Sequence, residues 1–193
     1  SDLTLFMRLI LFVIAFFPAF FVSAQATKPA DSSFRHTLSA ILQSYSTGFA
    51  GAKGDLIAED AQSFTYECLL HLPALNPGII SEYVSDNDTS HAWKNVLFES
   101  DDFNAAKEQY RKFFAMVRSV GFTYNQNYLA LSASYAAPDE DIRFNSIRFT
   151  IYPAPGIYKD VVTDLSMEYK MSVWELSLQV YSTAEEQQAL KGR

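Results

Sequence analysis

Hydrophobic positions recur with two different periods along this chain, and the change of period separates helices from strands. From residue 34 to residue 49, apolar side chains return every three or four positions, at Phe34, Leu38, Ile41, Leu42, Tyr45 and Phe49. This spacing predicts an amphipathic helix. Asp31 and Ser32 precede it as capping residues, and three glycines between residues 48 and 54 predict a left-handed exit from its last turn.

A second helical stripe is the strongest in the chain. It consists of Phe103, Ala106, Tyr110, Phe113, Phe114, Val117 and Val120. We predict a helix with Ser100 or Asp101 as its N-cap and Gly121 just after its last turn. Because this stripe carries much aromatic bulk, we expect it to pack against the inner face of a sheet.

Period two predicts strands in the first half of the chain. Residues 63–72 alternate, with Phe64, Tyr66, Cys68, Leu70 and Leu72 on the inner face. A turn-forming stretch over residues 73–78 precedes residues 79–84, which we expect to return as the second strand of a hairpin. For residues 91–98 we expect a short helical turn around Trp93.

The second half also alternates. We predict strands over residues 128–135, 147–152 and 173–181 and a weak strand within 161–169, with inward residues Leu129, Leu131, Ala133, Tyr135, Ile147, Phe149, Ile151, Trp174, Leu176, Leu178 and Val180. Ile142 and Phe144 are out of phase, which predicts a bulge near Asn145 or a later strand start. Thr183 to Glu186 reads as a capping box for a short terminal helix.

The order of elements is therefore α-β-β-α-β-β-(β)-β-(α). It predicts an α+β fold in which an antiparallel sheet of about five strands carries two amphipathic helices on one face. In element order alone, the chain resembles secretion-chaperone-like α+β folds, and no motif of that family accompanies the order. We expect residues 31–193 to form a single domain.

The N-terminal region has the pattern of an export signal. Residues 1–6 form an extension ahead of an expected start at Met7, and Arg8 precedes an apolar run from Leu9 to Phe21. A small-residue exit ends at Ala24, so residues 7–24 resemble a cleaved secretory signal peptide. The run is too short for a typical spanning helix. We expect a mature chain without a stable membrane anchor and with a flexible lead over residues 25–30, exported to a periplasmic or extracellular space.

Composition narrows the classes of partner. The chain has 193 residues, a formal charge of −7 and 49% hydrophobic residues, which indicates a packed core. Its negative charge and the lack of a basic cluster disfavour binding to nucleic acid. Cys68, the only cysteine, cannot form an internal disulfide.

Two groups of residues could be reactive, but a structural role explains each of them more simply. Cys68 and His71 are three apart on a predicted strand and so face opposite sides, which favours a buried thiol over a nucleophile. Asp86, Asp88 and His91 resemble part of a cation loop, but His91 stands where a calcium loop needs glycine. We interpret that segment as a polar loop and predict neither a metal site nor a cofactor.

The outward residues of the predicted sheet form the candidate binding surface: Glu67, His71, Tyr128, Arg148, Tyr152, Glu175, Gln179 and Tyr181. Tyrosines among mixed charges can recognise a ligand, or they can be ordinary cross-strand pairs. We expect an exported, non-catalytic binding or assembly module for a protein or a glycan on this face, or for an apolar molecule between helices and sheet. The alternative is an exported enzyme that uses carboxylates such as Glu67 and Glu175.

Overall fold

The structure, a computed structural model, describes residues 29–73, 75–85 and 89–184. Its elements follow the chain in this order: α2 (Pro29–Tyr45), β1 (Lys53–Asp60), β2 (Ser63–Cys68), β3 (Ile79–Val84), β4 (Thr89–Ser100), α3 (Phe103–Arg118), β5 (Gly121–Tyr124), β6 (Asn127–Ser132), β7 (Phe144–Tyr152), the short 3-10 helix η1 (Gly156–Tyr158), β8 (Val161–Lys170) and β9 (Val173–Ser182).

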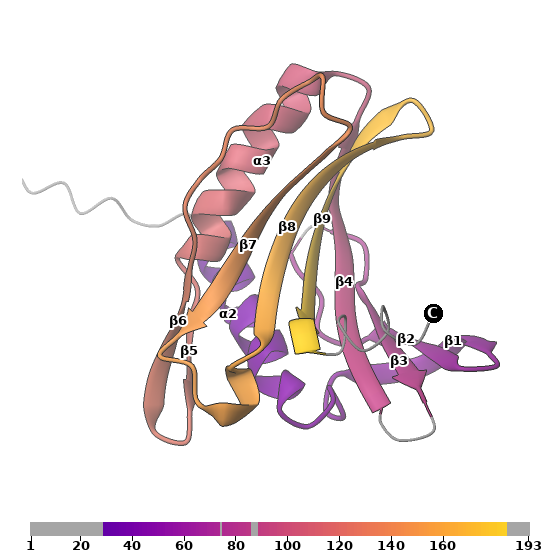
Figure 1. The fold of residues 1–193 in the computed structure, drawn as a ribbon, viewed down its shortest axis with the longest axis vertical. Helices are drawn as coiled ribbons and strands as arrows, with labels where there is room; N and C mark the ends of the chain where they lie inside the picture. The colour runs from indigo at the N-terminus through magenta and orange to yellow at the C-terminus, as the bar shows by residue number, and fades with distance from the viewer. Residues whose placement is uncertain (1–28, 74, 86–88, 185–193) are drawn as a thin grey trace, which may run out of the picture.

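All strands belong to one antiparallel sheet. Its order is β1-β2-β3-β4-β9-β8-β7-β6-β5, so the last strand of the chain lies beside β4 in the middle. The predicted α+β class with an antiparallel sheet and two helices is confirmed. The predicted number of about five strands is wrong, because the sheet has nine within the described residues. Figure 1 shows β1, β2 and β3 grouped at one side of the molecule and β5 and β6 at the other.

Helix α3 packs lengthwise on the sheet through the predicted stripe, whose members from Phe103 to Val117 are buried. The Phe103 ring lies 5.2 Å from that of Trp174 on β9, and the Tyr110 hydroxyl donates a hydrogen bond to the Leu165 carbonyl on β8 at 3.2 Å. The predicted cap is wrong by one or two residues. Asp102 is the N-cap, and its carboxylate accepts from the Asn104 amide at 2.8 Å.

Helix α2 completes the core beside α3. Its Phe34 ring packs 6.1 Å from that of Phe113, and its Ser39 hydroxyl donates to the Gly121 carbonyl on the edge strand β5 at 3.1 Å. The helix begins at Pro29, within the stretch we expected to be a flexible lead. After it the chain turns through left-handed Gly48 and Phe49, with φ of 61° and 60°, so the predicted left-handed exit is present.

The prediction of a helical turn around Trp93 is wrong, because residues 89–100 form the long central strand β4. Its alternation is hidden in two ways. The polar Asn95 occupies an inward position beside Leu178, and the register shifts between Val96 and Phe98, which breaks the period.

Two edge strands were missed. β1 pairs with β2 through two register shifts, and its residues 55–60 are exposed, so no period of two is visible. β5 begins at Gly121, which we had predicted as the residue after the helix end. Helix α3 ends instead at Arg118, and its C-cap is Ser119, whose hydroxyl donates to the Met116 carbonyl at 2.6 Å.

Several strand boundaries also differ from the predictions. β2 ends at Cys68 and β6 at Ser132, earlier than expected, and β8 is a full strand of ten residues. β7 begins at Phe144 and pairs with β8 without a bulge. Ile142 and Phe144 are simply exposed.

Some predictions fall outside the described residues. These are the signal pattern before residue 25 and most of the predicted terminal helix, of which only Thr183 and Ala184 are described, both helical. Within the described ranges, no helix is long and apolar enough to cross a membrane.

Candidate functional site

The candidate site lies on the outer face of the sheet, which we define as the face turned away from α3. At its centre, Arg148 and Tyr181 from the predicted binding surface contact Asp164, which the sequence analysis did not include. Arg148 on β7 donates from Nη2 to the Tyr181 hydroxyl on β9 at 2.8 Å. Asp164 on β8, the strand between them, has its Oδ2 atom 3.7 Å from the Arg148 Nε and 3.4 Å from the Tyr181 hydroxyl, which donates to it.

The Asp164 carboxylate is the most unusual group of this cluster. Its side chain is only 13% exposed, and burial raises its pKa above the ordinary value, while the Arg148 charge and the hydrogen bond from Tyr181 oppose that rise. Its Oδ1 atom is buried and makes no hydrogen bond within the described part of the chain. A buried acceptor without a donor costs free energy in the folded protein.

Glu175 on β9 belongs to a second cluster toward the other end of the strand. It accepts a hydrogen bond from Lys170 Nζ at 2.7 Å and lies 3.8 Å from Lys94 Nζ. Glu99 and Glu168 are its neighbours across the two flanking strands. The hydrogen bond to Glu175 is the main cause that raises the pKa of Lys170. Lys170 and Lys94 therefore offset the charge of Glu175 and its two acidic neighbours at this end of the sheet.

Glu67 and His71 are not brought to either cluster. Glu67 lies on β2, and both β3 and β4 separate it from Glu175 on β9. At about 4.8 Å per strand spacing, the two are at least about 14 Å apart, beyond the roughly 6.5–9.5 Å of paired glycosidase carboxylates. His71 is exposed and lies after the end of β2. This placement does not favour the enzyme alternative built on Glu67 and Glu175.

Tyr128 and Tyr152 form an aromatic platform at the β6–β7 end of the outer face. Their exposed fractions, 66% and 75%, are the highest among the described tyrosines. Ala130 pairs with Tyr152 on one side and with Gly121 on the other, so the two tyrosines are diagonal neighbours about 7–8 Å apart. A Cβ atom at Gly121 would collide with the Tyr128 ring and hydroxyl. The hydroxyl end of the Tyr128 ring thus lies over Gly121 on β5, as aromatic side chains do when they cover edge glycines.

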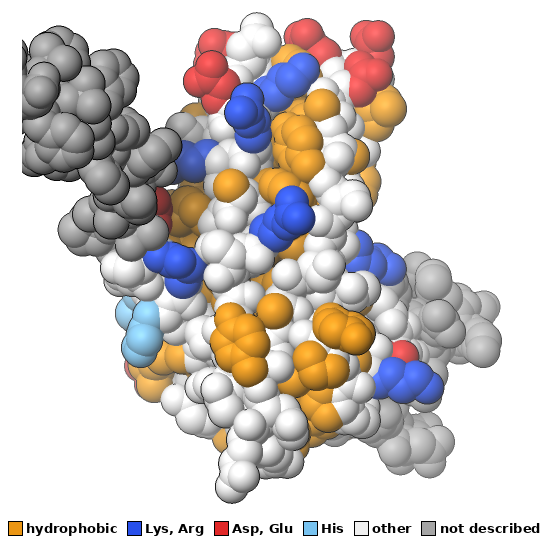
Figure 2. Space-filling model, turned by 90° about the vertical axis from the view of Figure 1, so that its left-hand side faces the viewer, with side chains coloured by type: hydrophobic (Ala, Val, Ile, Leu, Met, Phe, Trp, Pro, Cys, Tyr) orange, Lys and Arg blue, Asp and Glu red, His pale blue; other side chains and the backbone are white. Residues whose placement is uncertain are grey.

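A polar strip connects the platform to the Arg148 cluster. The outward positions of β7 are Ser146, Arg148, Thr150 and Tyr152, and all four are exposed. Figure 2 shows the side of the molecule where β5 and β6 lie, on which hydrophobic side chains gather in the lower half among uncharged polar ones and acids gather at the top. The strip offers hydroxyl groups, one guanidinium and two aromatic rings to a ligand.

The groups considered for nucleophilic or metal chemistry have structural surroundings in the described ranges. Cys68 is buried as predicted, and burial raises the pKa of its thiol. His91 lies on β4, where its Nε2 is 3.2 Å from Glu82 Oε1, while Asp86 and Asp88 lie outside the described residues. No group of three or more metal-ligating side chains occurs in residues 29–73, 75–85 and 89–184.

Sequence reasoning found Arg148 and Tyr181 because their strands alternate, and it missed Asp164 because β8 does not. Val161, Val162 and Thr163 are consecutive buried residues. The available signal was the polar series of Asp164, Ser166 and Glu168 at every second position.

No protein-family model, curated protein or solved structure matches this chain.

Proposed function

We propose that this protein is an exported, non-catalytic binding module that recognises a glycan on the outer face of its sheet. The observation that carries the proposal is the platform of Tyr128 and Tyr152, two strongly exposed tyrosines on adjacent strands. Exposed aromatic rings are suited to stacking, because they bury apolar area with little loss of conformational freedom.

A glycan fits the chemistry of the strip better than a charged or wholly apolar ligand. The C–H faces of a pyranose ring are apolar and can lie on a tyrosine, while its hydroxyls need both donors and acceptors. Arg148 supplies donors, and the exposed hydroxyl groups of Ser146 and Thr150 supply both donors and acceptors. Arg148 and Tyr152 are four residues apart on β7, about 13 Å, a span suited to a short oligosaccharide.

A separate observation supports the exported location. The pattern of residues 7–24 supports export, which would bring the face into contact with extracellular carbohydrates. Intact mass of exported material tests this location, with a mature start at Gln25 as the expected result.

The test of the binding role is a glycan microarray probed with purified, folded protein. We expect specific signals that Tyr152→Ala reduces about fivefold or more, because the stacking of a nucleic-acid base on an aromatic ring, a related contact, is worth about 1–3 kcal/mol. The matched control is Tyr83→Ala, which removes a tyrosine that is 52% exposed on β3, at the other side of the sheet. Absence of any signal, or equal loss in both variants, would overturn the glycan assignment.

A further inference from the structure

A groove on helix α3, separate from the outer face, has the character of a second binding site. It has a volume of about 550 Å³ and is lined by Glu108, Arg111, Lys112, Phe114, Ala115 and Tyr135. Five of these residues come from α3, and Tyr135 comes from the segment that follows β6. The volume lies within the range of about 300–1,000 Å³ that is usual for small-molecule sites.

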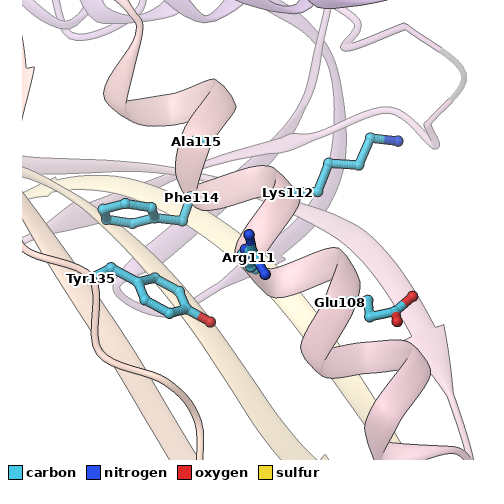
Figure 3. A pocket seen from close by; sticks show the side chains of 6 residues that line it. All are labelled: Glu108, Arg111, Lys112, Phe114, Ala115 and Tyr135. Atoms are coloured by element: carbon cyan, nitrogen blue, oxygen red, sulfur yellow. The ribbon is translucent and has the colours of Figure 1, made fainter.

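The apolar wall of the groove is fixed from behind. The Phe114 ring is 5.0 Å from the Tyr135 ring and 5.4 Å from that of Phe149 in the core. Tyr110, which is buried, supports Tyr135 at 6.5 Å. Tyr135 itself remains 38% exposed. Figure 3 shows the rings of Phe114 and Tyr135 side by side, with the Tyr135 hydroxyl on the side of Arg111.

The rim of the groove carries two exposed bases, Arg111 and Lys112, and one acid, Glu108. Neither basic side chain makes an ion pair or a hydrogen bond within the described ranges. Elsewhere on the sheet, Lys53, Arg148 and Lys170 each contact a carboxylate at 3.7 Å or less. In a chain with 22 acidic and 15 basic residues, two neighbouring unpaired bases beside an aromatic wall are complementary to an anion.

We propose that this groove binds a small amphipathic monoanion, such as an aromatic carboxylate or sulfonate. Its flat apolar part lies against Tyr135 and Phe114, and its anionic group accepts hydrogen bonds from Arg111 and Lys112. Glu108 at the rim disfavours a second negative charge. Burial raises the pKa of the Tyr135 hydroxyl, which therefore stays protonated near neutral pH and can donate a further hydrogen bond.

The probe for this site is anilinonaphthalene sulfonate, an aromatic monoanion whose fluorescence rises in apolar surroundings. We expect saturable binding to the folded protein at one site. Arg111→Gln and Tyr135→Ala should each weaken it about tenfold or more, since a hydrogen bond to a charged group contributes about 1.5–3 kcal/mol. Added salt should weaken binding to wild type more than to Arg111→Gln.

The matched control is Arg118→Gln, which removes an exposed base in the last turn of the same helix, outside the groove. This variant should bind the probe within about twofold of wild type. Thermal unfolding of every variant distinguishes loss of the site from loss of the fold. No binding to wild type, or equal binding by Arg111→Gln, Tyr135→Ala and wild type, would overturn the proposal.

Discussion

The contact between the two helices offers a direct test of how the core is held together. Phe113 on α3 is 8% exposed and packs against Phe34 of α2. Phe113→Ala removes a buried ring and leaves a cavity between two helices that are also fixed to the sheet. We expect a loss of about 3–5 kcal/mol in the free energy of unfolding, from a total of about 5–15 kcal/mol for a domain.

Urea unfolding, followed by far-ultraviolet circular dichroism, measures the loss as a lower midpoint at an unchanged slope. Glu108→Gln, an exposed change on the same helix, should alter stability by less than about 0.5 kcal/mol. The double variant with Phe34→Ala should show a coupling of about 0.5–1.5 kcal/mol, the range for aromatic pairs. A midpoint of Phe113→Ala equal to that of wild type would refute the role of this contact.

Three further predictions concern the sheet. Gly121→Ala should displace the exposed Tyr128 ring and lower stability by about 0.5–1 kcal/mol, whereas Gly51→Ala, where a Cβ meets nothing within 4 Å, should be neutral in the same urea assay. Partial burial works to raise the pKa of Glu82, but its contacts with Lys53 and His91 bring it below 4.5. Glu82→Gln should therefore cost up to about 1 kcal/mol above that pH and progressively less as the pH falls below it. For Asp164 the sign is opposite: its pKa lies above 3.8 in the folded protein because of burial, so Asp164→Asn should be at least as stable as wild type at neutral pH. The difference in stability between this variant and wild type should disappear below pH 3.8. Thermal melts measured across this pH range would instead show a constant difference if Asp164 were not buried.

The sequence correctly predicts those helices and strands that have one buried face and one exposed face. The stripe of α3 and the alternation of β9 and β7 follow directly from such burial, because apolar residues then repeat with the period of the element. β8 was ambiguous since Val161 and Val162 are both buried, so that the strand is covered on both faces at that end. β1 was invisible for the opposite reason, because its residues 55–60 are exposed.

The candidate site shows a different limit of sequence reasoning. Strand phase correctly placed Arg148 opposite the apolar residues of β7, but phase does not reveal which strands are neighbours. β7, β8 and β9 are consecutive antiparallel strands, and this brings Arg148, Asp164 and Tyr181 together. The pairing of β9 with β4 places Glu175 three strands from Glu67. That pairing is long-range and leaves no local signal in the chain.

The most direct test of the central claim is amide NMR mapping with the oligosaccharide that binds best on the array. We predict shift changes at Tyr128, at residues 148–152 and at Tyr181, with few changes at residues 108–115 of α3. These shift changes should be lost in Tyr152→Ala and retained in Tyr83→Ala. Changes confined to α3 and Tyr135, or their absence from β6, β7 and β9, would contradict the assignment of the outer face as the glycan site.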